Sequence, residues 1–473
     1  MSLDQITEEL IARQTPEAQA IIRLLLAQVA ALQEEVAAVK SEVARLKKTP
    51  QNSSLPPSTQ HPHAKPPARK PKSKNQRGGQ PGHEKHERPL IPTDQCNDVV
   101  PLKPTQCRRC GTKLLGQDPQ PLRSQVWELP EIKPLVTEFQ RHRLACPCCG
   151  ETTCAELPPG VPTGQSGPRL VALAGLLMAC FRQSKRRTAL FLEAILNQPC
   201  CPALTVKMQT QVTAAVRPAY EELAAQLPTQ EQLCIDESPT KQQTSKAWLW
   251  VFVAQAFTVF ALRTTRAATV LDDLLTTVFQ GIVNCDRAKM YWQCGRLQWC
   301  WAHLKRDFQA LIDSDDRQAK RLGHDLMRPT RELFRHWSRC RDGTITRVGF
   351  ERLMQPIRRE VDSLLLRGMC SGNDRLYGMC RELHDHRAWL WTFVDHAGIE
   401  PTNNISERAL RHGVIWRKLS FGTQSASGSR FVETMLTVIE TCRQQDRPVF
   451  DYLTAAVAAH FQRAPCPSLL PRA

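Results

Sequence analysis

Two apolar runs that each lead into an aspartate restrict the fold of this chain more than any other feature. Residues 233–235 lead into Asp236, and residues 281–285 lead into Asp286. The stretch KAWLWVFVAQAFTVFALR lies between them, and its aromatic and β-branched residues predict two strands with a turn near residues 254–257. The helical stretch DDLLTTVF follows before the second run. A three-strand meander followed by a helix and a further strand predicts a mixed α/β sheet.

Carboxylates held at or near the ends of strands are rigidly placed and can share a hard cation. Mg²⁺ prefers oxygen ligands and is usually held by one or two carboxylates together with phosphate. Two such ions, roughly 3.5–4 Å apart, can contact the attacking and leaving oxygens of a phosphodiester. We therefore expect two Mg²⁺ (or Mn²⁺) ions at Asp236 and Asp286, with Glu237 as an alternative ligand to Asp236. Each aspartate also has a simpler interpretation, as a turn or loop-capping residue.

The third carboxylate of such a site is expected at Glu407. It is the only acidic residue in NNISERALRHGVIWRKLSFGTQSASGSR, residues 403–430, a stretch with helical character and possible caps among its first residues. The carboxylate would hold metal while the neighbouring bases bind DNA phosphates; an i,i+4 ion pair with Arg411 is the simpler interpretation. The expected DNA-binding residues here are Arg408, Arg411, Arg417 and Lys418.

The net charge of +17 and the pI near 9.3 favour a polyanionic partner, and nucleic acid before a membrane surface. The sequence contains no run of 18 apolar residues, so no transmembrane helix is predicted. The acidic N-terminus does not resemble a secretory signal. The 19 cysteines are an odd number in a chain without an export signal. They therefore indicate a reducing cytoplasm with thiols and metal rather than a disulfide framework.

Two CxxCG motifs predict a zinc ribbon. The first contains Cys107 and Cys110, and the second contains Cys146 and Cys149. Four thiolates suit one tetrahedral, structural Zn²⁺, and glycine after the second cysteine lets the backbone turn around the metal. The sequence between the motifs alternates like the strands of a β-hairpin. Other nearby cysteines could replace a ligand: Cys96, Cys148 and Cys154.

The N-terminal region has the heptad pattern of a coiled coil. β-branched residues at a and mostly Leu at d favour a parallel two-stranded coil, and Glu at g with Lys at e allows opposite charges to meet across it. The alternative is a helix packed on its own chain. The a positions are Ile22, Val29, Val36 and Val43, and the d positions are Leu25, Leu32, Val39 and Leu46. Residues 47–89 then carry ten Lys or Arg against two Glu, which predicts an extended basic linker that tethers or binds DNA non-specifically.

Three helices are expected between residues 168 and 228. The break NQPCCP between the second and third resembles the turn of a helix-turn-helix, which would present Lys207, Gln209 and Gln211 to DNA. Plain helix packing is the alternative.

Several motifs together resemble a DDE-type transposase of the insertion-sequence 66 family. They are CIDES at 234–238, NCDRAKMYW at 284–292, CWAHLKRDF at 300–308 and TNNISERALRHGVIWRKLSFGTQSASGSRF at 402–431. The family often has Gly-Tyr where this chain has Arg287-Ala288. The resemblance implies that Asp236, Asp286 and Glu407 form the catalytic triad of a ribonuclease-H-like core. It also implies that His303, Lys305 and Arg306 approach DNA, although a structural histidine is an equal interpretation.

The expected organisation is multidomain α/β. Its parts are a coiled-coil helix (1–47), a basic linker (48–92), a zinc ribbon (93–160), a helical, helix-turn-helix-like segment (165–229), a ribonuclease-H-like core (230–310 and 401–445) with a mostly helical insertion (311–400), and a C-terminal piece (446–473).

The expected function is metal-dependent cleavage of transposon ends and strand transfer into target DNA, by phosphodiester hydrolysis and transesterification. The alternatives are a non-catalytic DNA-binding protein and a decayed transposase. Expected partners are DNA, a second or further copies of the chain, and, from the resemblance, accessory proteins encoded beside it in a bacterial, nucleoid-associated setting.

Overall fold

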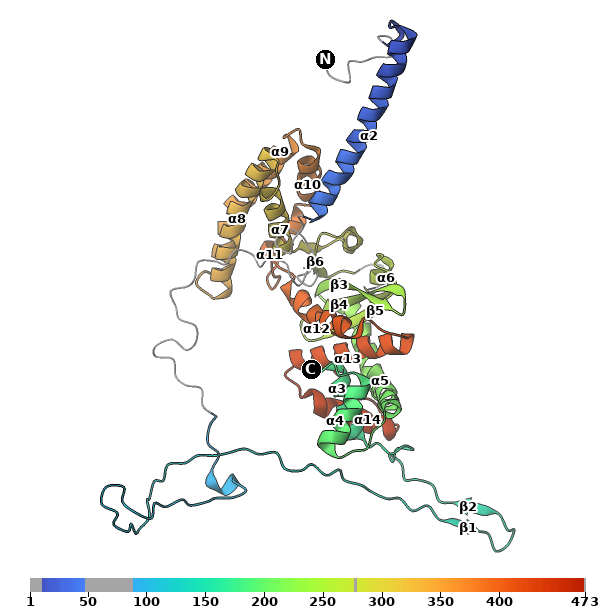
Figure 1. Cartoon of the computed structure of the whole chain (residues 1–473), viewed down its shortest axis with the longest axis vertical. Helices are drawn as coiled ribbons and strands as arrows, with labels where there is room; N and C mark the ends of the chain where they lie inside the picture. Colours follow the sequence, from blue (N-terminus) through green and yellow to red (C-terminus); the bar gives the residue numbers. More distant parts are fainter. Residues whose placement is uncertain (1–10, 47–87, 276–278, 472–473) are drawn as a thin grey trace.

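A computed structural model describes residues 11–46, 88–275 and 279–471 of the chain. Figure 1 shows the arrangement of the elements. Most of the expected basic linker, residues 48–87, lies outside the described residues. No helix among the residues described is both long and apolar enough to cross a membrane.

A five-stranded mixed sheet forms the centre of the fold. Its strands are β3 (Gln232–Gln242), β4 (Ser245–Val253), β5 (Thr258–Arg263), β6 (Ile282–Cys285) and β7 (Leu297–Trp299), in the order β5-β4-β3-β6-β7. The first three are antiparallel, whereas β6 and β7 run parallel to β3. Helix α6 (Thr269–Leu275) connects β5 to β6. The predicted meander, helix and strand are therefore confirmed, while β7 was not predicted.

The first strand is longer than the sequence indicated. The apolar run ends before Asp236, but β3 continues to Gln242 because it pairs with β4 as far as Gln242 and Ser245. Its pairing with β6 ends earlier, at Cys234 and Asn284. Asp236 thus lies not at the end of its strand, but just beyond the point where β3 loses its parallel neighbour.

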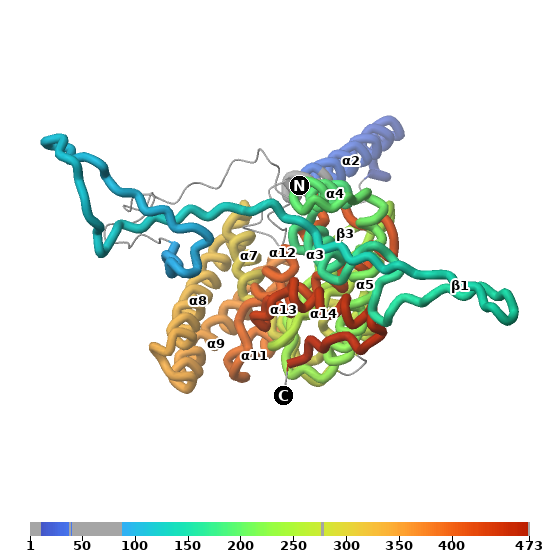
Figure 2. Tube along the Cα trace, turned by 90° about the horizontal axis from the view of Figure 1, so that it is seen from below, coloured from blue at the N-terminus to red at the C-terminus, as the bar shows by residue number. Residues whose placement is uncertain are grey.

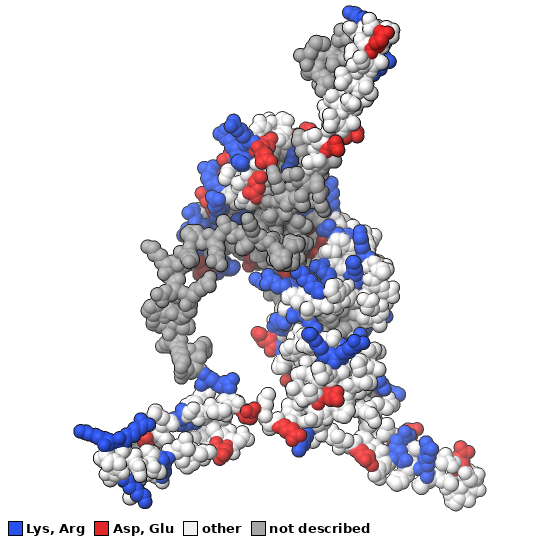
Figure 3. Space-filling view, in the orientation of Figure 1, with Lys and Arg blue, Asp and Glu red and all other residues white. Residues whose placement is uncertain are grey.

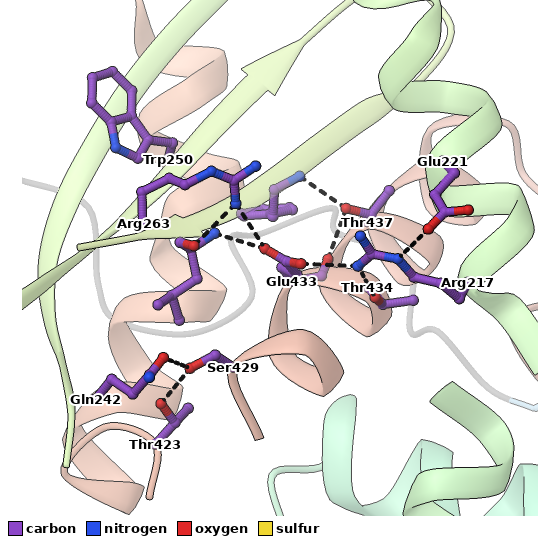
Figure 4. A network of polar contacts seen from close by, with 12 residues as sticks. Arg217, Glu221, Gln242, Trp250, Arg263, Thr423, Ser429, Glu433, Thr434 and Thr437 are labelled. Atoms are coloured by element: carbon purple, nitrogen blue, oxygen red, sulfur yellow. Dashed lines mark hydrogen bonds and ion pairs between the residues drawn. The ribbon is translucent and has the colours of Figure 1, made fainter. Parts of the chain in front are cut away.

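Helix α13 (Ala426–Gln444) covers the β5 edge of the sheet with three side chains spaced four residues apart. The amide N–H of Leu262 donates to Glu433 at 2.9 Å, that of Phe260 to Thr437 at 2.8 Å, and that of Thr258 to Thr441 at 3.1 Å. Glu433 is buried and also pairs with two arginines, Arg217 at 2.9 Å and Arg263 at 3.3 Å (Figure 4). These contacts satisfy donors that an open edge strand would leave unpaired.

The expected helical insertion covers the opposite edge. It consists of α8 (Arg317–Arg341), α9 (Arg347–Met369), α10 (Asp374–Asp385) and α11 (Ala388–Asp395), and it follows α7 (Trp301–Ile312). Gln298 of β7 accepts the amide of Phe393 at 2.7 Å, and the indole of Trp301 donates to the carbonyl of Leu390 at 2.7 Å. The insertion therefore packs against the β7 edge of the sheet through α11.

The three helices expected near the middle of the chain are present as α3 (Pro168–Ala179), α4 (Lys185–Leu196) and α5 (Pro202–Ala225). The C-terminal helix α14 (Val449–Phe461) packs against α3 and α5, and α13 packs against α5. Residues expected to form a separate helical segment and a separate C-terminal piece thus share one hydrophobic core.

Helix α2 (Pro16–Leu46) contains the predicted heptads. Leu25, Leu32, Val36 and Val39 are each at least half exposed on it. The side chains of Val43 and Leu46 lie outside the described residues. Beyond the short η3 (Thr93–Gln95), the region expected to form the zinc ribbon contains the two-stranded hairpin of β1 (Arg143–Ala145) and β2 (Thr152–Cys154) and an isolated bridge between Gln106 and Lys113. The longer hairpin predicted between the two CxxCG motifs is absent from this described region.

Candidate active site

The register between β3 and β6 brings two aspartates together. Cys234 pairs with Asn284, and Asp236 and Asp286 each follow two residues later. Because side chains alternate between the faces of a sheet and neighbouring strands lie about 4.8 Å apart, both carboxylates project on the same face. One oxygen of each is held by a backbone amide, Asp236 by Glu237 at 2.9 Å and Asp286 by Ala288 at 2.8 Å.

The start of helix α12 (Asn404–Ser420) places Glu407 over this face. The side-chain amide of Asn403 donates to the carbonyl of Ile235 at 2.7 Å, next to Asp236. The amide of Asn284 donates to the carbonyls of Glu400 at 2.8 Å and Thr402 at 3.2 Å. Asn403 occupies the N-cap position of α12, but its side chain makes no capping hydrogen bond and instead ties α12 to the strand that carries Asp236.

The electrostatic environment of Asp236 is that of crowded acids. Burial, and then the charges of Glu237 and Asp286, raise the pKa of Asp236 well above its usual range, and Glu407 adds to the effect. Carboxylates from three segments thus repel one another when all are ionised, and a divalent cation among them would relieve this repulsion.

Glu237 is engaged elsewhere. One of its oxygens accepts from Arg266 at 2.6 Å, and the other accepts from the hydroxyl of Tyr291. Arg266 also approaches Asp286 to 4.0 Å. Both oxygens of Glu237 are therefore occupied by hydrogen bonds from Arg266 and Tyr291. This favours Asp236 over Glu237 as a metal ligand.

The loop after Asp286 is held by Arg287. Its guanidinium pairs with Asp307 of α7 at 2.9 Å and with Glu382 of α10 at 3.0 Å. This residue stands where the resembled family often has glycine, and here it links the aspartate loop to the insertion. Neither partner could be predicted from a local sequence pattern.

Glu407 has an oxygen that lacks a hydrogen-bond donor. This buried Oε1 lies 3.5 Å from Arg306 and 3.8 Å from His303 without a hydrogen bond to either. Cys300, His303 and Glu407 present ligand atoms within 4.8 Å of one another. Burial, followed by the charge of Arg306, lowers the pKa of His303, which leaves its imidazole neutral near pH 7. An unsatisfied buried carboxylate oxygen on a residue whose charge reaches Asp236 fits a bound cation.

Glycine at position 413 allows α12 to approach the sheet closely. A Cβ at Gly413 would overlap a side-chain carbon of Leu249 in β4. Gly378, on α10, is also helical, but a Cβ there would meet nothing within 4 Å. The distance between Glu407 and the aspartates therefore depends on the absence of a side chain at Gly413, about two turns after Glu407 in α12.

Gly413→Ala is expected to destabilise the chain by about 1–3 kcal/mol through overpacking and to weaken metal binding by displacing Glu407. Gly378→Ala is the matched control, and it should be neutral or stabilise by up to about 1 kcal/mol through helix propensity. Chemical denaturation and Mn²⁺ titration of both variants measure the two effects. Equal behaviour of the two variants would contradict the close approach.

The basic residues expected to bind DNA divide into two groups. Arg408, Arg411, Lys418 and Lys305 are exposed. Arg417 instead donates to Ser238 at 3.2 Å and to the carbonyl of Pro239, which ties α12 to β3. Arg306 is half-buried beside Glu407. Figure 3 shows Lys and Arg gathered on the face where α12 and α13 lie.

The four cysteines of the expected zinc site do not converge in this structure. Figure 2 shows the cyan segment after residue 93 on one side of the body and the hairpin of β1 and β2 on the other. Each motif is nevertheless a formed turn, because Gly111 donates to Cys107 at 3.0 Å and Gly150 to Cys146 at 2.9 Å, both glycines having positive φ. Hydrogen bonds from Thr112 lower the pKa of Cys110, and the backbone amide of Cys149 lowers that of Cys146.

Comparison with known families accounts for this combination of features. The Transposase IS66 family matches residues 164–430, which is more than half of the chain. The chain belongs to this transposase family. The zinc-finger binding domain of transposase IS66 matches residues 104–150, which include all four cysteines, and a family of unknown function matches residues 8–89.

The IS66 assignment agrees with the zinc-binding and DNA-related roles expected from the motifs. A similar curated protein is the uncharacterized protein y4qI of Sinorhizobium fredii, 25% identical over 248 residues. The aligned region is 46% of this chain and 44% of that protein, so the chain spans less than half the length of this relative.

Proposed function

We propose that this IS66-family chain is an active DDE transposase that cuts the ends of its element and joins them to target DNA. The observation that carries the proposal is the convergence of Asp236, Asp286 and Glu407 from β3, the end of β6 and α12. A ribonuclease-H-like core is part of the proposal. Its support is a three-strand antiparallel meander with two parallel strands added beside its first strand.

Asp236, Asp286 and Glu407 would hold two Mg²⁺ or Mn²⁺ ions. Such ions supply activation of a water nucleophile and stabilisation of the leaving oxygen in an in-line displacement. Asn403 ties the start of α12 to β3 and so would position Glu407 above the strands, and the guanidinium of Arg306 lies 3.5 Å from the Glu407 carboxylate. Attack by water needs no covalent bond to the protein, so no Ser or Tyr nucleophile is invoked.

DNA phosphates would lie along the exposed side of α12. Arg408, Arg411 and Lys418 follow one another at intervals of three and seven residues, which keeps them on one side of the helix. Lys305 of α7 would extend this surface past Glu407. The zinc domain and the basic linker would add further contacts to DNA. Accessory proteins encoded beside its gene would act with the chain on the bacterial nucleoid.

The proposal is tested with purified chain and DNA that carries the inverted repeats flanking its gene. With Mg²⁺ or Mn²⁺ we expect nicks at the element ends that leave 3′-OH groups, followed by joining to target DNA. EDTA should abolish both reactions. DNA binding without any metal-dependent breakage, with the accessory proteins present, would instead support a non-catalytic DNA-binding protein or a decayed transposase.

A parallel two-stranded coiled coil of α2 is the proposed contact between two copies. The exposed Leu25 and Leu32, at d positions, leave an apolar seam that a second helix would bury. Leu25→Asp with Leu32→Asp is expected to convert the dimer to monomers, because four charges would enter the seam. Light scattering after size exclusion measures the mass. Arg23→Asp with Gln28→Asp, outside the a and d positions, is the control, and an unchanged mass of the Leu variant would contradict the seam.

A further inference from the structure

A cavity of about 510 Å³ lies between α7 and α8, beside the start of α12. Its volume is within the roughly 300–1,000 Å³ of small-molecule sites. Ala302, Arg306 and Gln309 of α7 and its C-cap residue Asp313 line the cavity, at the spacing of one helix face. Thr402 and Asn404, which also line it, directly precede the turn that carries Glu407.

The floor of the cavity is apolar and partly aromatic. Met327 and Phe334 face it from α8, seven residues apart on one side of the helix. Met327 is 2% exposed, whereas Phe334 is only partly buried and packs against the main core. A planar, weakly polar ligand can therefore lie against the ring of Phe334.

The rim is cationic. Lys305 is exposed and lines the cavity, and Arg306 does so while also facing Glu407. Arg331 of α8 does not line the cavity itself, but it is exposed and lies between Met327 and Phe334 in the helix, one turn from each. The side chains of Gln309 and Asp313, joined at 2.8 Å, supply hydrogen-bonding groups at one end.

We propose that this cavity holds one nucleotide turned out of the DNA helix, next to the phosphodiester that is cut. An aromatic floor, groups for the edge of a base and cations for its phosphate are what an unstacked nucleotide requires. The inference rests on the proposed function for the position of the strand, because the cavity opens beside Glu407. A bound phosphate alone would leave the apolar floor without a role.

The test uses element-end duplexes with 2-aminopurine at successive positions around the cut, and the full chain with Ca²⁺ in place of Mg²⁺. A rise in fluorescence at one position is expected, because the analogue is quenched while stacked. Phe334→Leu keeps the apolar packing but removes the ring face, and it should abolish the rise and weaken binding about tenfold. Gln309→Leu should reduce the rise. Tyr377→Ala, which removes an exposed aromatic ring of α10 away from the cavity, is the control and should retain it.

The outcomes separate this inference from the proposed function. A rise that depends on Phe334 supports the nucleotide site, even if Mg²⁺ produces no cleavage. Absence of a rise at every position, or a rise that persists in Phe334→Leu, overturns the site. Cleavage by the unmutated chain in either of these cases would leave the transposase proposal standing.

Discussion

Glu407→Gln is expected to slow strand cleavage at least about a thousandfold, while DNA binding is retained or strengthened. A metal ligand contributes several kcal/mol to the transition state, and each 1.36 kcal/mol is a factor of ten in rate. Glutamine keeps the shape of the side chain but lacks the charge that balances a divalent cation. Binding should not suffer, because the substitution removes a negative charge that faces DNA phosphates.

The matched control is Glu400→Gln, which changes an exposed carboxylate in the loop before α12. It should cleave at the rate of the unmutated chain. Both variants are compared in single-turnover cleavage of element-end DNA and in a gel-shift titration. Cleavage by Glu407→Gln at a normal rate would mean that another acid completes the site.

Cys107→Ser is expected to reduce the zinc content from about one ion per chain to nearly none. A structural zinc site contributes its binding free energy to folding, and apparent values in small zinc domains are about 10–16 kcal/mol. The separated motifs of residues 104–150 should therefore converge only when all four thiolates hold the metal. Elemental analysis measures the zinc, and limited proteolysis of this region measures its fold.

Cys148→Ser provides the control for the zinc site, because Cys148 is exposed and lies inside the second motif without being an expected ligand. It should retain both zinc and protease resistance. If Cys107→Ser retained zinc and Cys148→Ser lost it, Cys148 rather than Cys107 would be the zinc ligand. An unmutated chain that binds no zinc would contradict the ribbon.

Local pattern was sufficient for much of the fold. The aromatic and β-branched residues of β4 and β5 predicted both strands and their turn, and the helical periodicity predicted α3, α4 and α5. The two aspartates were recognisable because an apolar run leads into each. The full length of β3 was not, because residues 237–242 are polar except for Pro239 and only pairing with β4 makes them a strand. The three-residue β7 carries too little pattern to be recognised.

The residues that position the site were harder to predict because their partners are distant in sequence. Asn403 donates a hydrogen bond to Ile235, and Arg287 forms ion pairs with Asp307 and Glu382. Gly413 leaves room for Leu249. A side-chain amide bonded to a strand carbonyl leaves no local pattern, and a helical glycine resembles a weak helix former. The spacing of Glu433, Thr437 and Thr441 similarly matches an ordinary helix face until the edge strand is known.

The central claim, that three carboxylates from three segments hold the same cations, is tested most directly by Mn²⁺ binding. Electron paramagnetic resonance titration of the chain with element-end DNA measures the affinity for Asp236→Asn, Asp286→Asn and Glu407→Gln. We expect each substitution to weaken Mn²⁺ binding at least about tenfold, because each removes a charged oxygen ligand. Unchanged affinity in all three variants would contradict the site.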